Sequence, residues 1–167
     1  GNRLLGPNVW PSVAGFKRTV SAYYKQISAL GWVISTALEQ HLCLTPGAMT
    51  KQMTKPISQL RLLHYVRQND QINAKSVNMG AHTDYECLTL LHQRQKGLQV
   101  MTRGDEWIDV PVIPEAYIVN VGDMMEAWSN GAFRSTPHRV LNLSAERYSM
   151  PSTICHGSIS SLSMVMP

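Results

Sequence analysis

Short apolar runs alternate with turn signals from residue 57 onward, and this alternation restricts the possible folds more than any other feature of the chain. The turn signals include Lys96-Gly97, Gly122-Asp123 and Asn130-Gly131, and the Asn-Gly pair is a strong signal for a tight turn. Many short strands at regular intervals are typical of a β-sandwich or β-barrel. The apolar runs are 57–66, 87–92, 98–101, 107–110, 117–121, 134–140 and 147–154.

A helical pattern precedes these runs. Between residues 15 and 44 the apolar residues recur in steps of three and four, which places them on one face of a helix. Ser12 is the predicted N-cap, and Thr45-Pro46-Gly47 is the predicted stop. We expect this helix to pack on the core without contributing chemistry. The recurring residues are Phe16, Val20, Tyr23, Ile27, Leu30, Ile34, Leu38 and Leu42.

The composition predicts one folded domain with a hydrophobic core. The chain has 167 residues, of which 44% are hydrophobic and 16% are charged, so disorder is not expected. Its net charge is +4, but the basic residues are scattered rather than clustered, which argues against binding to nucleic acid. Composition and charge therefore predict a folded domain that does not bind nucleic acid.

Cysteine usage and hydropathy indicate the compartment. Cys43, Cys87 and Cys155 are odd in number and far apart, which argues against a disulfide framework or a zinc knuckle. Reduced cysteines are typical of the cytoplasm. No stretch has the length of a membrane-spanning helix, and the N-terminus lacks a signal-peptide pattern. We therefore expect a cytoplasmic protein, without a membrane segment, that acts as a monomer.

The sequence His82-Thr83-Asp84 offers half of a metal site. Side chains alternate along a strand, so His82 and Asp84 are predicted to share one face while Thr83 points to the other. An imidazole nitrogen and a carboxylate oxygen are both good metal ligands. Alone, however, such a triplet occurs often by chance and is more often a polar pair at a strand end than a metal site.

His138 is the candidate for the third ligand. It lies in a run with the pattern of a strand, 134–140, where a buried imidazole without a partner would destabilise the fold. Two histidines and one carboxylate on one side of a metal leave positions open for other ligands, which suits iron(II). Zinc prefers a closed tetrahedral site or a single open position, so His82, Asp84 and His138 favour iron.

Arg147 and Ser149 form a second candidate site. They are two residues apart in a predicted strand and therefore share a face. A guanidinium with a hydroxyl beside it is a good receptor for a carboxylate. With a metal site nearby, the pair could hold the far end of a dicarboxylate. The plain alternative is an exposed arginine beside a solvated serine.

With these residues, the chain resembles the isopenicillin N synthase-like branch of the iron(II)/2-oxoglutarate oxygenases. The resemblance is densest over residues 57–157, where the motifs occur in the family's order. The spacing also agrees, since His82 lies 56 positions before His138 and Arg147 follows His138 by nine. The matching segments are 61–65, 80–85, 97–100, 106–110, 119–123, 128–131, 135–140 and 146–151.

The resemblance implies a fold and a set of roles. The fold would be mainly β with an N-terminal helix, around a double-stranded β-helix or jelly-roll core. His82, Asp84 and His138 would bind iron(II), and Arg147 with Ser149 would bind the distal carboxylate of 2-oxoglutarate. Tyr65 matches a family tyrosine that hydrogen-bonds this cosubstrate. Dioxygen would be the oxidant, and ascorbate is a candidate accessory cofactor.

The implied activity is oxidative decarboxylation of 2-oxoglutarate coupled to hydroxylation or a related oxidation of a small organic substrate. Two alternatives remain within the resemblance. One is an iron(II) oxidase of the same branch that does not use 2-oxoglutarate, since such enzymes keep the Arg-x-Ser pair. The other is a truncated, inactive homologue that still binds metal. A hydrolytic zinc enzyme is disfavoured because no glutamate base is evident beside the ligands.

We therefore expect one structural domain with three segments. Residues 1–56 would form an N-terminal loop and the packing helix. Residues 57–157 would form the oxygenase core, and residues 158–167 an irregular tail. Members of the family are longer, so the chain would correspond to their C-terminal catalytic core.

Overall fold

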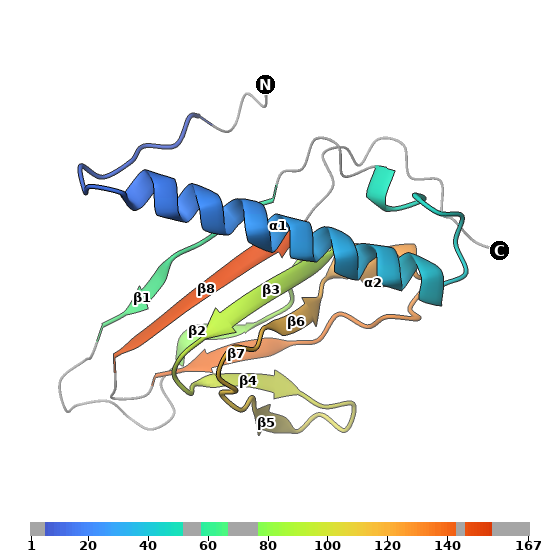
Figure 1. Ribbon diagram of the computed structural model, residues 1–167. Coiled ribbons are helices and arrows are strands. Elements are labelled where there is room, and N and C mark those ends of the chain that lie inside the picture. The colour runs from blue at the N-terminus through green and yellow to red at the C-terminus, as the bar shows by residue number, and fades with distance from the viewer. Residues whose placement is uncertain (1–5, 52–57, 67–76, 143–145, 155–167) are drawn as a thin grey trace.

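The computed structural model describes residues 6–51, 58–66, 77–142 and 146–154 (Figure 1). The predicted tail 158–167 lies outside these residues. In the described part, one long helix packs on strands that form two sheets. The elements are α1 (Phe16–His41), β1 (Leu63–Tyr65), β2 (Val77–His82), β3 (Leu88–Gln93), β4 (Leu98–Met101), β5 (Trp107–Asp109), β6 (Ile118–Val121), α2 (Asp123–Trp128), β7 (His138–Leu141) and β8 (Arg147–Ile154).

The two sheets have the connectivity of a jelly roll. One has the strand order β1-β8-β3-β6 and the other β2-β7-β4-β5, and their strand pairs are antiparallel. The chain passes from one sheet to the other and back, so that strands distant in sequence, such as β1 and β8, become neighbours. The predicted fold class, mainly β with an N-terminal helix and a jelly-roll core, is therefore confirmed.

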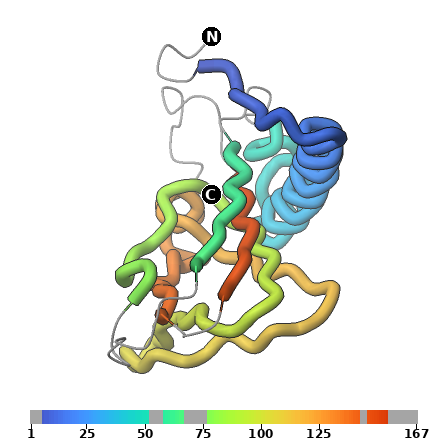
Figure 2. The backbone as a smooth tube through the Cα atoms, turned by 90° about the vertical axis from the view of Figure 1, so that its left-hand side faces the viewer, coloured from blue at the N-terminus to red at the C-terminus, as the bar shows by residue number. Residues whose placement is uncertain are grey.

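Helix α1 covers the outer face of the sheet that contains β8 and β3, away from the β4–β5 hairpin (Figures 1 and 2). Alternation along β3 separates two environments. Leu88 and Leu90 are 0% exposed and pack in a cluster with Ile27 of α1 and Ile154 of β8. Leu91, one residue out of phase, instead lines a cavity between the sheets. The strand thus joins the hydrophobic core to the interior of the jelly roll.

The two ends of α1 differ from their predicted positions. The helix begins at Phe16 with Gly15 as N-cap, so Ser12 is not the cap. At the other end Cys43 has a φ of 53°, the left-handed conformation that ends a helix. Leu44 N–H then donates to Glu39 O at 3.0 Å, and Cys43 N–H to Gln40 O at 3.1 Å. This is a Schellman motif, and it ends the helix before the predicted Thr45-Pro46-Gly47 stop.

The side chain of Glu39 in α1 binds the backbone of residues 47–50, which follow the helix. Its side chain is 2% exposed, and its carboxylate accepts backbone N–H groups from Gly47 at 3.1 Å and from Met49 and Thr50 at 2.6 Å each. Burial raises the pKa of Glu39, but the hydrogen bonds from these residues outweigh burial and hold the pKa below the ordinary value of 4.5. The ionised carboxylate therefore stabilises the native state.

We expect Glu39→Gln to lower the free energy of unfolding by roughly 2–4 kcal/mol, since an amide nitrogen would face donors that need an acceptor. The wild type should also lose stability in acid. A carboxylate with a lowered folded-state pKa contributes fully above its unfolded pKa, and that contribution disappears as the pH falls through the folded value. Urea unfolding of both proteins between about pH 3 and pH 7 measures this. If the free energy of unfolding depended on pH in the same way in the wild type and in Glu39→Gln, the stabilising role of the Glu39 carboxylate would be contradicted.

Candidate metal and cosubstrate site

The two sheets enclose a cavity of about 460 Å³, and the predicted site residues line it. His82 is the last residue of β2, and His138 is the first residue of β7. These residues are partners in the antiparallel register of β2 and β7, so their side chains lie next to each other. Asp84 follows two residues after His82. The end of β2, the residues just after it and the start of β7 thus bring the three candidate ligands close together.

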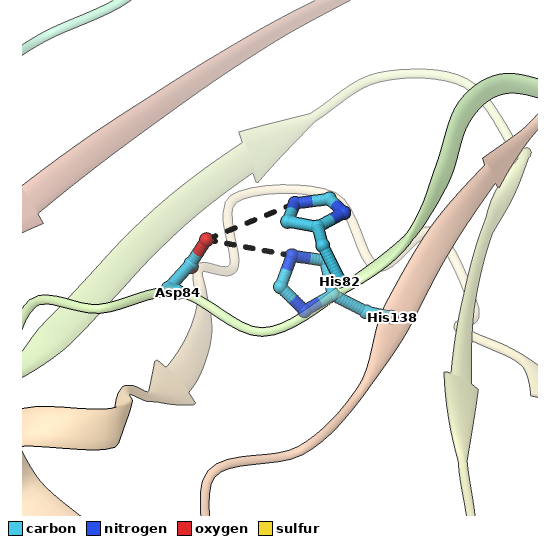
Figure 3. A group of neighbouring side chains, drawn as sticks. All are labelled: His82, Asp84 and His138. Atoms are coloured by element: carbon cyan, nitrogen blue, oxygen red, sulfur yellow. Dashed lines mark ion pairs between the residues drawn. The ribbon is translucent and has the colours of Figure 1, made fainter.

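The three side chains converge on a common point (Figure 3). Asp84 Oδ1 lies 3.6 Å from His138 Nε2 and 3.9 Å from His82 Nε2. One ligand atom from each residue lies within 4.8 Å of the others. Two atoms that each bind one metal at about 2.0–2.2 Å are at most about 4.4 Å apart, so a small inward movement of these side chains would let a single ion contact all three.

The backbone fixes which imidazole nitrogen is available. His82 Nδ1 lies 2.8 Å from Gly80 O, and His138 Nδ1 lies 3.1 Å from Thr136 O. A carbonyl oxygen only accepts, so in the neutral ring each Nδ1 carries the proton and each Nε2 has the lone pair that can bind a metal. Both free lone pairs belong to the atoms that face Asp84. This is the arrangement that a metal-binding histidine needs.

Asp84 lies just outside the strand in which it was predicted. Strand β2 ends at His82, and Asp84 lies two residues beyond it, where the chain turns toward β3. Asp123 N–H donates to Asp84 O at 2.7 Å, which fixes the main chain of the turn. Gly122 lies in close contact with the backbone of Asp84 and Glu86, and a Cβ at this position would lie 2.0 Å from Glu86 O. Only glycine allows this approach.

The structure also brings Arg147, Ser149 and Tyr65 together. In the register of β1 and β8, Tyr65 lies opposite Arg147. The guanidinium lies over the Tyr65 ring, with its central carbon 4.9 Å from the ring centroid. Arg147 Nη1 donates to Ser149 Oγ at 3.2 Å. The predicted pairing of Arg147 and Ser149 on one strand face is thus seen in the geometry, and both side chains are buried.

Arg147 is a buried cation to which the described residues offer no matching anion. It is 4% exposed, and Nη2 donates to Gln93 Oε1 at 3.3 Å, but Nε has no hydrogen-bond partner in the described part of the chain. Within the described ranges, no carboxylate forms a salt bridge with it. Burial lowers the pKa of Arg147, and Tyr65 opposes this change, but a guanidinium stays protonated in either case. The buried charge and the unused Nε–H group fit an incoming carboxylate.

Sequence reasoning missed two residues at this site. Thr89 and Asn120 both donate hydrogen bonds to Asp84 Oδ2. Their strands were predicted, and strand alternation places Thr89 on the face opposite Leu88 and Leu90. The sequence did not indicate which face of each strand turns inward, so these residues could not be singled out.

Comparison with known proteins assigns the family. Residues 56–156 match the family described as the 2OG-Fe(II) oxygenase superfamily. The chain belongs to this superfamily. Membership agrees with the donor set, because two imidazoles and one carboxylate with open positions beside them are typical of oxygenases that use iron(II). It also agrees with the buried Arg147 in the same cavity, which forms no salt bridge with any residue that the structure describes.

Relatives in this superfamily resemble the chain over most of its length. The 2-oxoglutarate-dependent dioxygenase thnC of Trichoderma harzianum is 33% identical over 162 residues, which are 93% of this chain and 50% of the relative. Clavatol oxidase claD of Penicillium crustosum is 37% identical over 161 residues, which are 90% of this chain and 48% of the relative. The chain thus spans about half the length of these relatives.

The solved structures agree with this assignment. A full-length Neurospora crassa protein, crystallised in complex with alpha-KG and thymine, is 32% identical to the chain with a TM-score of 0.83. The match covers 90% of this chain and 50% of that one. The jelly roll described above is therefore the oxygenase fold of the superfamily.

Proposed function

We propose that this chain is the catalytic core of an iron(II) oxygenase that couples oxidative decarboxylation of 2-oxoglutarate to hydroxylation or a related oxidation of a small organic substrate. One observation supports this most: a possible metal-binding group and a buried arginine without an anion line the same cavity. A dicarboxylate needs both of these features if one end binds metal and the other a cation.

In this proposal iron(II) is held by Nε2 of His82, Nε2 of His138 and Oδ1 of Asp84. The bonds from the Nδ1 atoms to Gly80 and Thr136 prevent the rings from presenting the wrong nitrogen. When bound, iron(II) together with 2-oxoglutarate supplies dioxygen activation, and succinate and carbon dioxide are released as the substrate is oxidised. The protein contributes the geometry of the ligands and leaves coordination positions open.

Arg147, Ser149 and Tyr65 would bind the distal carboxylate of 2-oxoglutarate. The guanidinium can form two parallel N–H···O bonds, while Ser149 and Tyr65 supply hydroxyl groups beside it. Because Arg147 is buried, it would meet this carboxylate in an environment where charge pairing is stronger than in water. The alternative of an oxidase that does not use 2-oxoglutarate is less favoured, since relatives such as thnC are named for this cosubstrate.

The remaining lining of the cavity is largely apolar, which suits a small organic substrate. Apolar walls exclude water and so protect reactive species from side reactions. Thymine, present in the Neurospora crassa structure, and clavatol, in the name of claD, are reasonable first compounds to test. The apolar lining includes Leu91, Leu98, Val100, Ile118 and Val140.

The proposal also includes a cytoplasmic monomer that does not act on nucleic acid. Cys43 is a free cysteine, as is typical of a reducing compartment. Among the described residues, no helix combines the length and the apolar character needed to cross a bilayer.

An assay of succinate release against oxygen uptake tests the proposed activity. We expect the purified chain, with iron(II) and 2-oxoglutarate under air, to release one succinate for each dioxygen consumed, and thymine or clavatol can be added as candidate substrates. A sample without 2-oxoglutarate is the control and should consume no oxygen. Oxygen uptake without succinate release would instead indicate the iron(II) oxidase. The absence of both oxygen uptake and succinate release would indicate an inactive homologue.

A further inference from the structure

Asp84 is held by side chains from two neighbouring strands. Thr89 of β3 and Asn120 of β6 are partners in the antiparallel register, and both line the cavity. Thr89 Oγ1 donates to Asp84 Oδ2 at 2.6 Å, and Asn120 Nδ2 donates to the same oxygen at 2.8 Å. Thr89 is 5% exposed, so water does not compete freely for its hydroxyl group. Thr89 and Asn120, which face each other across two strands, therefore both bind Oδ2 of Asp84.

The two oxygens of Asp84 thus have separate tasks. Oδ2 accepts both hydrogen bonds, and Oδ1 is the oxygen that faces Nε2 of His82 and of His138 (Figure 3). With two donors on Oδ2, the carboxylate cannot turn without breaking charge-assisted bonds, which are about twice as strong as neutral ones. Oδ1 alone keeps its lone pairs directed at the point where the three ligands meet.

We propose that Thr89 and Asn120 are positioning residues that hold Asp84 as a ligand through one oxygen only, and that they thereby set the affinity of the site for its divalent metal. This inference rests on the proposed function. A carboxylate that bound through both oxygens would occupy a coordination position needed by the cosubstrate or by dioxygen. Residues that hydrogen-bond metal ligands commonly tune a site in this way.

The bonds from Thr89 and Asn120 are not needed to hold the turn itself. The main chain of Asp84 is fixed by the bond from Asp123 N–H and by the close packing of Gly122. Loss of the side-chain bonds should therefore free the carboxylate while leaving the turn in place. The expected defect lies in metal binding rather than in folding.

Cobalt(II) titration of the metal-free chain tests this directly, because the metal can be followed by its visible absorption without turnover. Thr89→Val removes the hydroxyl group at nearly constant volume, and Asn120→Leu removes the amide donor. Each should weaken cobalt(II) binding by about 10- to 100-fold, because a single donor then holds Oδ2 and the carboxylate can turn Oδ1 away from the imidazoles. Thr89→Ser, which restores the donor, should bind within a few-fold of the wild type. Thermal unfolding of the metal-free proteins monitors the fold.

The outcomes separate the two proposals. If the wild type binds cobalt(II) and both Thr89→Val and Asn120→Leu bind it equally tightly, the positioning role is wrong while the metal site stands. Weak binding by Thr89→Ser equal to that of Thr89→Val would also overturn the role, since packing and not the donor would then matter. If the wild type itself does not bind cobalt(II), the metal site fails and this inference fails with it.

Discussion

Asp84→Ala is expected to abolish stable iron(II) binding and, with it, succinate production. Asp84 supplies the single anionic ligand among His82, Asp84 and His138, and its Oδ1 lies 3.6 Å and 3.9 Å from the two imidazole Nε2 atoms. Without it, two neutral imidazoles would face the metal, and the donors of Thr89 and Asn120 would lose their acceptor. We expect the metal content after gel filtration to fall to the background value. Iron content and succinate release are the measurements.

A matched control for Asp84→Ala is Glu106→Ala, which removes an exposed carboxylate from the turn between β4 and β5. This variant should retain the iron content and activity of the wild type, since its residue lies outside the cavity lining. Succinate release by Asp84→Ala at the rate of the wild type would refute the assignment of Asp84 as a ligand.

Arg147→Gln is expected to raise the concentration of 2-oxoglutarate required for half-maximal activity by roughly 30- to 1,000-fold. Loss of one partner of a buried charge pair typically costs about 2–4 kcal/mol, and each 1.4 kcal/mol corresponds to about a tenfold change in affinity. Iron(II) binding should not change, because Arg147 is not among the candidate ligands. Succinate release measured against the concentration of 2-oxoglutarate gives this value.

Two further variants show whether charge or geometry matters at this position. Arg147→Lys keeps the charge but not the planar fork, so an intermediate defect is expected. Ser149→Ala removes one hydrogen bond, worth about 0.5–1.5 kcal/mol, and should raise the requirement only about 2- to 12-fold. An unaltered dependence on 2-oxoglutarate in Arg147→Gln, with iron binding intact, would contradict its role in cosubstrate binding.

The candidate ligands could be found from sequence because their chemistry is local to short motifs. His82 and Asp84 lie two residues apart, and His138 lies in a recognisable strand pattern. Strand β2 nevertheless ends at His82, two residues before Asp84, so strand pairing does not itself hold Asp84 in place. The turn after His82 is shaped by Gly122, which is distant in sequence. Contacts of this kind leave no periodic signal.

Other features could not be predicted because they depend on packing between distant segments. Glu39 lies beside apolar positions of α1, and only the fold shows that backbone N–H groups of residues 47–50 surround its carboxylate. Helix α2 (Asp123–Trp128) is too short to show helical periodicity, and the sequence Gly122-Asp123 at its start predicts a turn instead. Thr89 and Asn120 become neighbours through the pairing of β3 with β6, and a single sequence does not show which strands pair or in which register.

The central claim is that His82, Asp84 and His138 bind one iron(II) while positions remain open for 2-oxoglutarate. Addition of iron(II) and then 2-oxoglutarate to the purified chain without oxygen tests this most directly. We expect a weak visible charge-transfer band that requires both components and is absent from Asp84→Ala. No band in the wild type, or an equal band in Asp84→Ala, would contradict the account.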